Sequence, residues 1–476
     1  MRRIKALGWV AAGLIAGVSA TWAAEPAKST MDEQVGVEVT VYNSNLGLVK
    51  DVRQVKLGEG EGLLQFMDVA SAIIPETVHV KSLDHPDQLE LLEQNYEYDL
   101  ISPQKLLEKY VGKTIKLSTW NQYQDRKDVV EATLLSMNSG PVYRIGNEIH
   151  LGHEGRPILP ELPEDLIARP TLSWQYRNQS RAPHRLEAAY LTNNIPWKAD
   201  YILSLNAEDT TADFSGWVTL DNKSGATYKN ATLKLVAGNV HRALQEREAG
   251  YYRMRKDMMA EAAPAAQFQE QGFFEYHLYD LQRPTTVKDN QTKQVSLLEA
   301  AGVGVRKELL VYGIDTYYTR QYLEQNPKQP VAVYVNIKNA KDNHLGMPLP
   351  QGIVRTYKAD NKGSLQFIGE DRIEHTPKDE TVRLKMGEAF DVTAERRQVD
   401  FKQLSSRLFE TAWEVTLKNH KKEEVTVGLI EPLPVPWTMV QNSHPYEKKD
   451  AFTIRFDVPV PKDGEVKVTY RVRVGL

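Results

Sequence analysis

The residues best suited to acid–base chemistry lie in one short stretch, Gly369–His375. The stretch holds three carboxylates, an arginine and a histidine. Two carboxylates beside a histidine can give and take protons at a reacting group. Charge runs on strands and turns are more often solvated surfaces. We therefore expect a solvated strand-and-turn face here, with acid–base chemistry at Glu370 and Glu374 as the alternative.

A second stretch carries side chains of the kind that bind metal ions. Glu148, His150, His153 and Glu154 offer oxygen and nitrogen ligands close together in the sequence. On a strand, Glu148 and His150 share one face, and His153 points to the other. A zinc site needs three or four ligands that converge on one point. We therefore expect a polar strand edge and no metal site.

Two tryptophans offer flat surfaces on which sugar rings can stack. Trp197 and Trp437 each follow a proline, and a tryptophan at a strand end more often fills a core. The sequence contains no glycine-rich phosphate loop, no nucleophile-elbow serine, no HExxH histidine pair and no cysteine. We therefore predict no catalytic, cofactor-binding or metal-binding residue, and no cofactor.

The elements that would position these residues are strands, because apolar residues alternate with polar ones along most of the chain. Residues 35–41 and 46–57 predict a hairpin with one buried face. Residues 452–460 and 465–474 alternate in the same way on either side of a four-residue turn. We predict that these two C-terminal strands form an antiparallel pair with one solvated face.

Several predicted strands end in asparagine, which terminates strands well because its side chain bonds to nearby backbone. The four cases are Asn193, Asn222, Asn339 and Asn419. We interpret them as marks of related β-sandwich modules. The alternative is that any all-β protein ends strands in this way.

Residues 101–165 have a different pattern. Ser102 and Pro103 predict the start of a short helix over 104–110. Strands are predicted at 113–120, 129–137, 142–145 and 148–151, with turns between them. One helix followed by short, bent strands indicates a small β-barrel of SH3-like or Sm-like kind.

The first 24 residues have the three-part pattern of a secretory signal peptide. A basic start with Arg2, Arg3 and Lys5 precedes an uncharged run over 6–18 and small residues up to Ala24. We expect export to the periplasm or the cell surface, with a mature chain that starts at Ala24 or Glu25. No later apolar run approaches the roughly 18 residues of a membrane span.

The composition agrees with an exported chain held together by burial alone. The sequence has no cysteine, so it forms no disulfide, and its formal net charge is −4. The acidic balance excludes a strongly basic surface, so nucleic acid is not an expected partner.

Shifts in pattern predict seven segments. They are a signal peptide (1–24), an N-terminal β domain (35–100), a small barrel-like domain (101–165), a β-sandwich (166–241), a mobile insertion or linker (242–272), a β-rich domain (273–400) and a C-terminal immunoglobulin-like sandwich (401–476). The fold class expected for the whole is mainly β, with few short helices. Residues 242–272 lack alternation and are rich in Ala, Gln, Met and charged residues.

Three further stretches are distinctive: Asn339–His375, Gly387–Val392 and Leu417–Trp437. With them, roughly residues 170–476 resemble a bacterial exported family of unknown function that includes the mucoidy-inhibitor-A-like proteins. The part from Gly346 to Asp391 carries the resemblance most specifically. The resemblance implies a β-rich envelope protein and brings no catalytic residue to this sequence.

These observations lead to two expectations about function. The first is a non-enzymatic envelope protein that binds or scaffolds other envelope proteins or surface polysaccharide through its sheets. The alternative is a hydrolase or lyase that acts on envelope polysaccharide. An enzyme of that kind needs a cleft in which two carboxylates converge to about 5–10 Å, whereas a scaffold needs exposed edges or patches.

Overall fold

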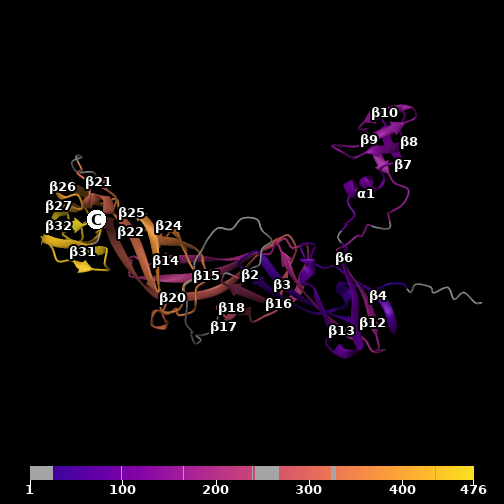
Figure 1. Cartoon of the computed structure of the whole chain (residues 1–476), viewed down its shortest axis with the longest axis horizontal. Helices are drawn as coiled ribbons and strands as arrows, with labels where there is room; N and C mark the ends of the chain where they lie inside the picture. The colour runs from indigo at the N-terminus through magenta and orange to yellow at the C-terminus, as the bar shows by residue number, and fades with distance from the viewer. Residues whose placement is uncertain are drawn as a thin grey trace, which may run out of the picture. The chain divides into compact units, whose positions relative to one another are not determined.

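The computed structural model describes residues 25–97, 99–163, 166–238, 240–241, 267–322, 328–434 and 436–475. The fold is mainly β, as predicted, and α1 (Pro103–Lys109) is the one α-helix of these described residues (Figure 1). The chain divides into two compact units. The first comprises residues 1–35, 52–69 and 80–187, and the second comprises 36–51, 70–79 and 188–476. The domain boundaries drawn from the sequence stay a prediction.

The first unit contains a four-stranded sheet. Its order is β1 (Ala27–Ser29), β4 (Gly60–Met67), β12 (Thr171–Asn178) and β6 (Leu89–Glu97). Phe66 and Trp174 form the centre of its buried face, with their ring centroids 5.0 Å apart. The buried guanidinium of Arg53 lies 3.6 Å from the centroid of Phe66 and donates to the carbonyl of Ser29 at 3.0 Å. A cation over an aromatic face is stabilised by the ring quadrupole.

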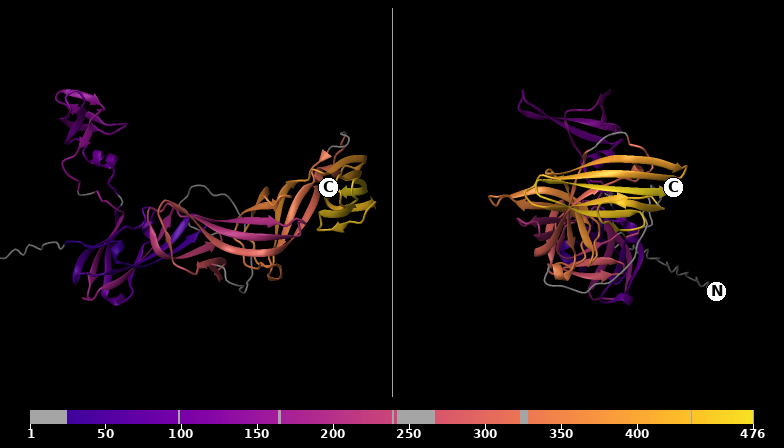
Figure 2. Two further views of the ribbon diagram at one scale, coloured as in Figure 1. Left: turned by 180° about the vertical axis from the view of Figure 1, so that it is seen from behind. Right: turned by 90° about the vertical axis from the view of Figure 1, so that its left-hand side faces the viewer.

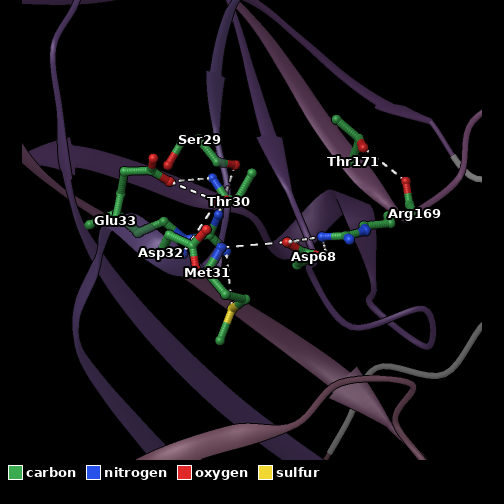
Figure 3. Close-up of polar contacts among 9 residues, drawn as sticks. Ser29, Thr30, Met31, Asp32, Glu33, Asp68, Arg169 and Thr171 are labelled. Atoms are coloured by element: carbon green, nitrogen blue, oxygen red, sulfur yellow. Dashed lines mark hydrogen bonds and ion pairs between the residues drawn. The ribbon is translucent and has the colours of Figure 1, made fainter.

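The start of the described chain is fixed by side-chain caps (Figure 3). Thr30 and Glu33 form a reciprocal capping box around a short 3₁₀ turn. The carboxylate of Asp68 accepts a hydrogen bond from the backbone N–H of Met31 at 3.4 Å. The same carboxylate accepts two from one nitrogen of Arg169, at 3.0 and 3.1 Å. These contacts position β1 for its parallel pairing with β4.

A smaller, five-stranded sheet follows α1 in the first unit, in the segment for which the sequence predicts a small barrel. Its order is β10 (Glu148–Leu151), β9 (Val142–Ile145), β8 (Arg126–Ser136), β7 (Thr114–Asn121) and β11 (Arg156–Ile158). The predicted helix and all four predicted strands are present, and the hydroxyl of Ser102 caps α1 by accepting from the N–H of Lys105. β11 is an additional strand. Among the described residues, β10 and β11 are the two edge strands of this sheet, so the strand order is open. The sheet packs on a core that includes Ile115, Leu117 and Leu134.

Two large sheets contain most strands of the second unit. An eight-stranded sheet has the order β17 (Phe268–Phe273), β18 (Tyr276–Leu281), β16 (Tyr228–Ala237), β2 (Gln34–Tyr42), β3 (Leu46–Val55), β13 (His184–Asn193) and β5 (His79–Ser82), with β19 (Thr285–Val287) beside β16. Residues 242–266 of the expected insertion lie outside the described residues. Strand structure resumes at Phe268, before the position near Phe273 that the sequence suggested.

A ten-stranded sheet provides the second layer. Its order is β24 (Leu365–Ile373), β23 (Gly352–Ala359), β14 (Trp197–Leu205), β15 (Thr211–Asn222), β20 (Gln291–Tyr312), β28 (Val425–Pro432), β31 (Thr453–Val460) and β30 (Glu447–Lys448), with β22 (Ala332–Lys338) and β25 (Thr381–Glu388) joined through β20. Trp197 joins the two layers, because its indole N–H donates to the carbonyl of Val236 on β16 at 3.2 Å.

A five-stranded sheet completes the C-terminal part. Its order is β21 (Lys328–Gln329), β26 (Val392–Ser405), β27 (Leu408–Asn419), β32 (Gly464–Gly475) and β29 (Trp437–Asn442). Figure 2 draws its long strands side by side in orange and yellow. One core joins this sheet to β28 and β31 of the ten-stranded sheet, and the buried polar groups Arg396 and Glu431 lie within that C-terminal part.

The prediction that the last two strands form an antiparallel pair is wrong. β31 pairs with β28 and β30, whereas β32 pairs with β27 and β29, so the turn between β31 and β32 connects two sheets. The alternation itself is confirmed, because Phe456 and Val458 of β31 and Val468 and Tyr470 of β32 are all buried in the same core. Two strands with alternating apolar residues can bury their apolar faces either as neighbours in one sheet or across the core between two sheets. β31 and β32 face each other across the core.

The same five-strand arrangement occurs twice in the second unit. In the first copy β14, β15 and β20 pair in succession, and β16 pairs with β19. In the second copy β26, β27 and β32 pair in succession, and β28 pairs with β31. In each copy the set of three strands lies in one sheet and the pair of strands lies in another. The structure therefore supports related sandwich modules.

Buried asparagines close equivalent loops in the two copies. The side-chain oxygens of Asn222 and Asn419 accept the N–H two residues later, and their amides donate to the carbonyl four residues later. Each amide also donates to carbonyls at the end of a strand in the other sheet. Asn339 is likewise buried and bonded to backbone, but its partners belong to a longer loop.

A parallel pairing brings β2 beside β16 within the second unit. Glu38 of β2 lies between two lysines there, with Lys234 at 2.6 Å and Lys50 at 2.8 Å. Burial raises the pKa of Glu38, but the hydrogen bonds from the two lysines outweigh burial, so the net pKa is lowered. None of the helices in the described residues has the length and hydropathy to cross a membrane.

Candidate functional site

A polar groove of about 600 Å³ lies on the outer face of the ten-stranded sheet. Strand alternation creates it. On β14 the side chains of Ala199, Tyr201 and Leu203 are buried, so Lys198 and Asp200 point to the opposite, solvated face. The groove is lined by residues of β14, β15, β20 and β23. All four strands belong to the second unit.

Asp200 is the centre of a charged network in this groove. Its carboxylate accepts a hydrogen bond from the hydroxyl of Thr219 at 2.8 Å and one from Nη1 of Arg355 at 3.3 Å. The ammonium of Lys198 lies 3.6 Å away. The amide of Gln294 donates to Thr219 at 3.2 Å and extends the network to β20.

Arg355 connects Asp200 to a second carboxylate. Its Nε lies 3.2 Å from Oε2 of Glu370 on β24. The guanidinium therefore balances a carboxylate on each side, and with Lys198 the network holds two positive and two negative side chains. Such a set presents donors and acceptors next to each other, without a strong net field.

Aromatic side chains flank this network. Trp217 is half-buried and lies opposite Asp200 in the pairing of β14 with β15. Tyr357 also lines the groove and meets Phe367 of β24 edge-to-face, with ring centroids 5.7 Å apart. Phe367 itself is 55% exposed. Polar groups beside partly exposed aromatic rings are suited to bind ligands that have both hydroxyl groups and apolar faces.

Of the acid cluster predicted from the sequence, Glu370 lies beside the groove, where it pairs with Arg355. Asp371 points to the opposite face of β24 and accepts the backbone N–H of Lys385 at 2.7 Å. Glu374 is exposed after the strand end. The cluster therefore does not converge on one reacting group.

His375 belongs to a separate environment. Its Nδ1 accepts the backbone N–H of Gln351 at 3.2 Å, and its Nε2 is buried with no hydrogen-bond partner among the described residues. Burial lowers its pKa, which the neighbouring charge of Glu374 opposes. The imidazole is half-buried and lies beside the start of β23.

The second cluster is a polar strand edge. His150 lies 3.5 Å from Glu148, and the Nδ1 of His153 accepts the N–H of Gly155 at 2.8 Å. No group of three or more ligands placed to hold a metal occurs in the part of the chain that the structure describes.

The two tryptophans singled out in the sequence differ in burial. Trp197 is 3% exposed and fills the core, as predicted. Trp437 is half-buried, donates to the carbonyl of Ala451 at 2.9 Å and lies under the ammonium of Lys448. Sequence reasoning missed Trp217, although the alternation of β15 assigns it to the solvated face with Ser215 and Thr219. The contact between Asp200 and Arg355 had no local signal.

A family model for a domain of unknown function, DUF4139, matches residues 186–475, which include every residue of the groove. The chain belongs to the DUF4139 family. The match bears out the expected domain of unknown function over most of the chain. A search of curated proteins found no match. Within the DUF4139 region the groove combines a charged network with flanking aromatic rings.

Proposed function

We propose that this protein is a non-enzymatic envelope protein that binds surface polysaccharide through the groove around Asp200. The observation that carries the proposal is the Asp200–Arg355–Glu370 network with Trp217 and Tyr357 beside it. Sugars present hydroxyl groups at their edges and C–H groups on their faces. The charged network supplies hydrogen-bond partners for the sugar hydroxyl groups. The aromatic rings supply apolar surfaces on which the C–H faces can pack.

The location is part of the same proposal. The first 24 residues have the pattern of a signal peptide, so the protein is exported to the periplasm or the cell surface. Membership among the mucoidy-inhibitor-A-like proteins, suggested by the stretch from Gly346 to Asp391, fits a role at the envelope. Intact mass of the exported protein tests the location, because the mature chain is expected to start at Ala24 or Glu25. A retained Met1 would contradict it.

The binding test measures affinity for polysaccharide isolated from the envelope of the source cells, by calorimetry on the exported protein. Trp217→Ala and Asp200→Asn are each expected to weaken binding about tenfold or more, since each removes one recognition element. Phe390→Ala is the matched control, because Phe390 is an equally apolar residue that is 94% exposed and lies outside the groove. Equal affinity of all variants would refute the groove as the binding site.

The hydrolase or lyase alternative has its own measurement. It rests on two carboxylates, Asp200 and Glu370, that approach one groove. An enzyme of this kind shortens the polysaccharide, and Glu370→Gln stops it while Glu374→Gln does not. The binding proposal expects an unchanged chain length with the wild type and with both variants. Shortening that depends on Glu370 would replace the binding proposal with the enzymatic one.

A further inference from the structure

The small sheet of the first unit has an outer face on which apolar and basic side chains alternate. Residues that face each other across paired strands lie on the same face of a sheet. The pairing of β7 with β8 places Trp120 beside Lys127. In the next row Ser118 lies between Arg156 of β11 and Val129 of β8.

The pattern continues along the sheet. In the third row Lys116 lies between Ile158 and Glu131. In the fourth row Arg144 of β9 lies beside Ile149 of β10. Each of these four rows therefore contributes one basic residue and at least one apolar one.

The apolar members of this face are solvent-exposed. Leu151 lies two residues after Ile149 on β10 and therefore shares its face. Trp120 is 59% exposed, Ile149 63% and Leu151 87%, while Ile115 and Leu117 on the opposite face are buried. Large apolar side chains gathered on one exposed face mark interaction surfaces. The four rows carry four basic side chains and one acidic one, whereas the whole chain has a net charge of −4.

The tip of the hairpin between β7 and β8 adds a second aromatic residue. Tyr123 is fully exposed. The side chain of Asn121 accepts the N–H groups of Tyr123 and Gln124 at 3.1 and 3.2 Å and donates to Asp128 at 2.9 Å. The turn is therefore held in shape while its aromatic ring faces water.

We propose that this face, with the tip at Tyr123, docks on the surface of an anionic lipid bilayer. At such a surface, phosphate groups lie close to the acyl boundary. Tryptophan and tyrosine occupy that level, while lysine and arginine contact phosphate and keep their stems in apolar surroundings. Aliphatic residues such as Leu151 bury area in lipid, which sugar recognition does not require. A protein partner favours an apolar centre with charges at the rim, and here each row contains a charge.

Vesicle co-sedimentation tests the proposal with the full exported protein. The expected result is binding to phosphatidylglycerol vesicles that weakens with salt, and much weaker binding to phosphatidylcholine vesicles. Trp120→Ala with Leu151→Ser is expected to lower the partition coefficient about tenfold. Lys127→Gln with Arg156→Gln is expected to lower it roughly thirtyfold.

Matched controls use exposed residues of the second unit: Phe390→Ser for the apolar pair, and Lys422→Gln with Lys462→Gln for the charge pair. These variants should sediment like the wild type. Absence of wild-type binding, or equal losses in the control variants, would overturn the proposal. Binding only to a protein from an envelope extract, with none to vesicles, would also overturn it.

A second readout does not depend on affinity. Brominated phosphatidylglycerol should quench the tryptophan fluorescence of the bound wild type, and the quenching should fall sharply in Trp120→Phe although the protein still sediments. Quenching that is unchanged in Trp120→Phe would place the contact elsewhere on the molecule and refute the proposed face.

Discussion

Replacing Glu431 by glutamine should destabilise the C-terminal core far more than the same change at the protein surface. Glu431 and Arg396 are buried, with side chains 0% and 1% exposed, and form an ion pair at 2.6 Å. Tyr318 donates to the other oxygen of Glu431, and Arg396 also donates to Tyr470 at 3.0 Å. Burial disfavours the charge of Arg396, but Glu431 outweighs that cost and raises the pKa of the guanidinium above its usual range.

The expected loss of stability follows from the buried charge of Arg396, which Glu431→Gln leaves without a balancing carboxylate. The variant keeps the shape of the side chain but removes the charge that balances Arg396. An uncompensated buried charge costs about 3–5 kcal/mol of unfolding free energy. A domain of this size loses about 2–4 °C of melting temperature per kcal/mol, so the transition should fall on the order of 10 °C.

The assay is thermal and urea unfolding followed by tryptophan fluorescence, with Glu414→Gln as the matched control. Glu414 pairs with Arg397, the residue next to Arg396, at 2.8 Å on the exposed side of the sheet. Exposed pairs contribute about 0–1 kcal/mol, so the control should stay close to the wild type. The two units can unfold separately, so the shift is read on the transition that Glu431→Gln changes.

A double variant separates charge from packing. Arg396→Met with Glu431→Leu removes both charges and fills similar volume, so it should recover most of the stability that Glu431→Gln loses. If Glu431→Gln and Glu414→Gln lower the melting temperature equally, the reasoning about the buried pair is refuted. If the double variant is less stable than Glu431→Gln, the hydrogen bonds matter more than the charge balance.

Three further predictions concern the sheets. Val468→Asp should cost several kcal/mol because it buries an unpaired carboxylate, whereas Lys467→Asp should change stability by about 0.5 kcal/mol or less; equal losses of melting temperature would contradict the assignment of faces. Glu38→Gln should lower the free energy of unfolding at pH 7. This loss relative to the wild type should vanish as the pH falls through the lowered pKa of Glu38, because a carboxylate with a depressed pKa stabilises only while ionised. Urea unfolding from pH 7 to 3 measures the loss, and a loss that stays constant with pH would refute the prediction. Asn222→Ala and Asn419→Ala should each cost about 1–3 kcal/mol, since each leaves buried backbone groups without partners; a loss at one site only would show that the two loops are not energetically equivalent.

The sequence by itself determined the strands and their faces. Strand alternation has a period of two residues, so it depends only on neighbours in the chain. It placed Val468 in the core and Lys467 in water correctly, and the cap at Ser102 located the start of α1. The parity of β26 even assigns Arg396 to the buried face, against the usual preference of an arginine for water.

Only the tertiary structure decided which strands meet. The turn between β31 and β32 is compatible with a pair in one sheet or with a connection between two sheets, and the core that the two strands share selected the second. Asp200 and Arg355 are far apart in the chain and meet through the parallel pairing of β14 with β23. The same holds for Glu431, whose charge is balanced by Arg396 in another sheet. Pairing between distant strands depends on which apolar faces bury each other, and no local pattern of residues encodes that choice.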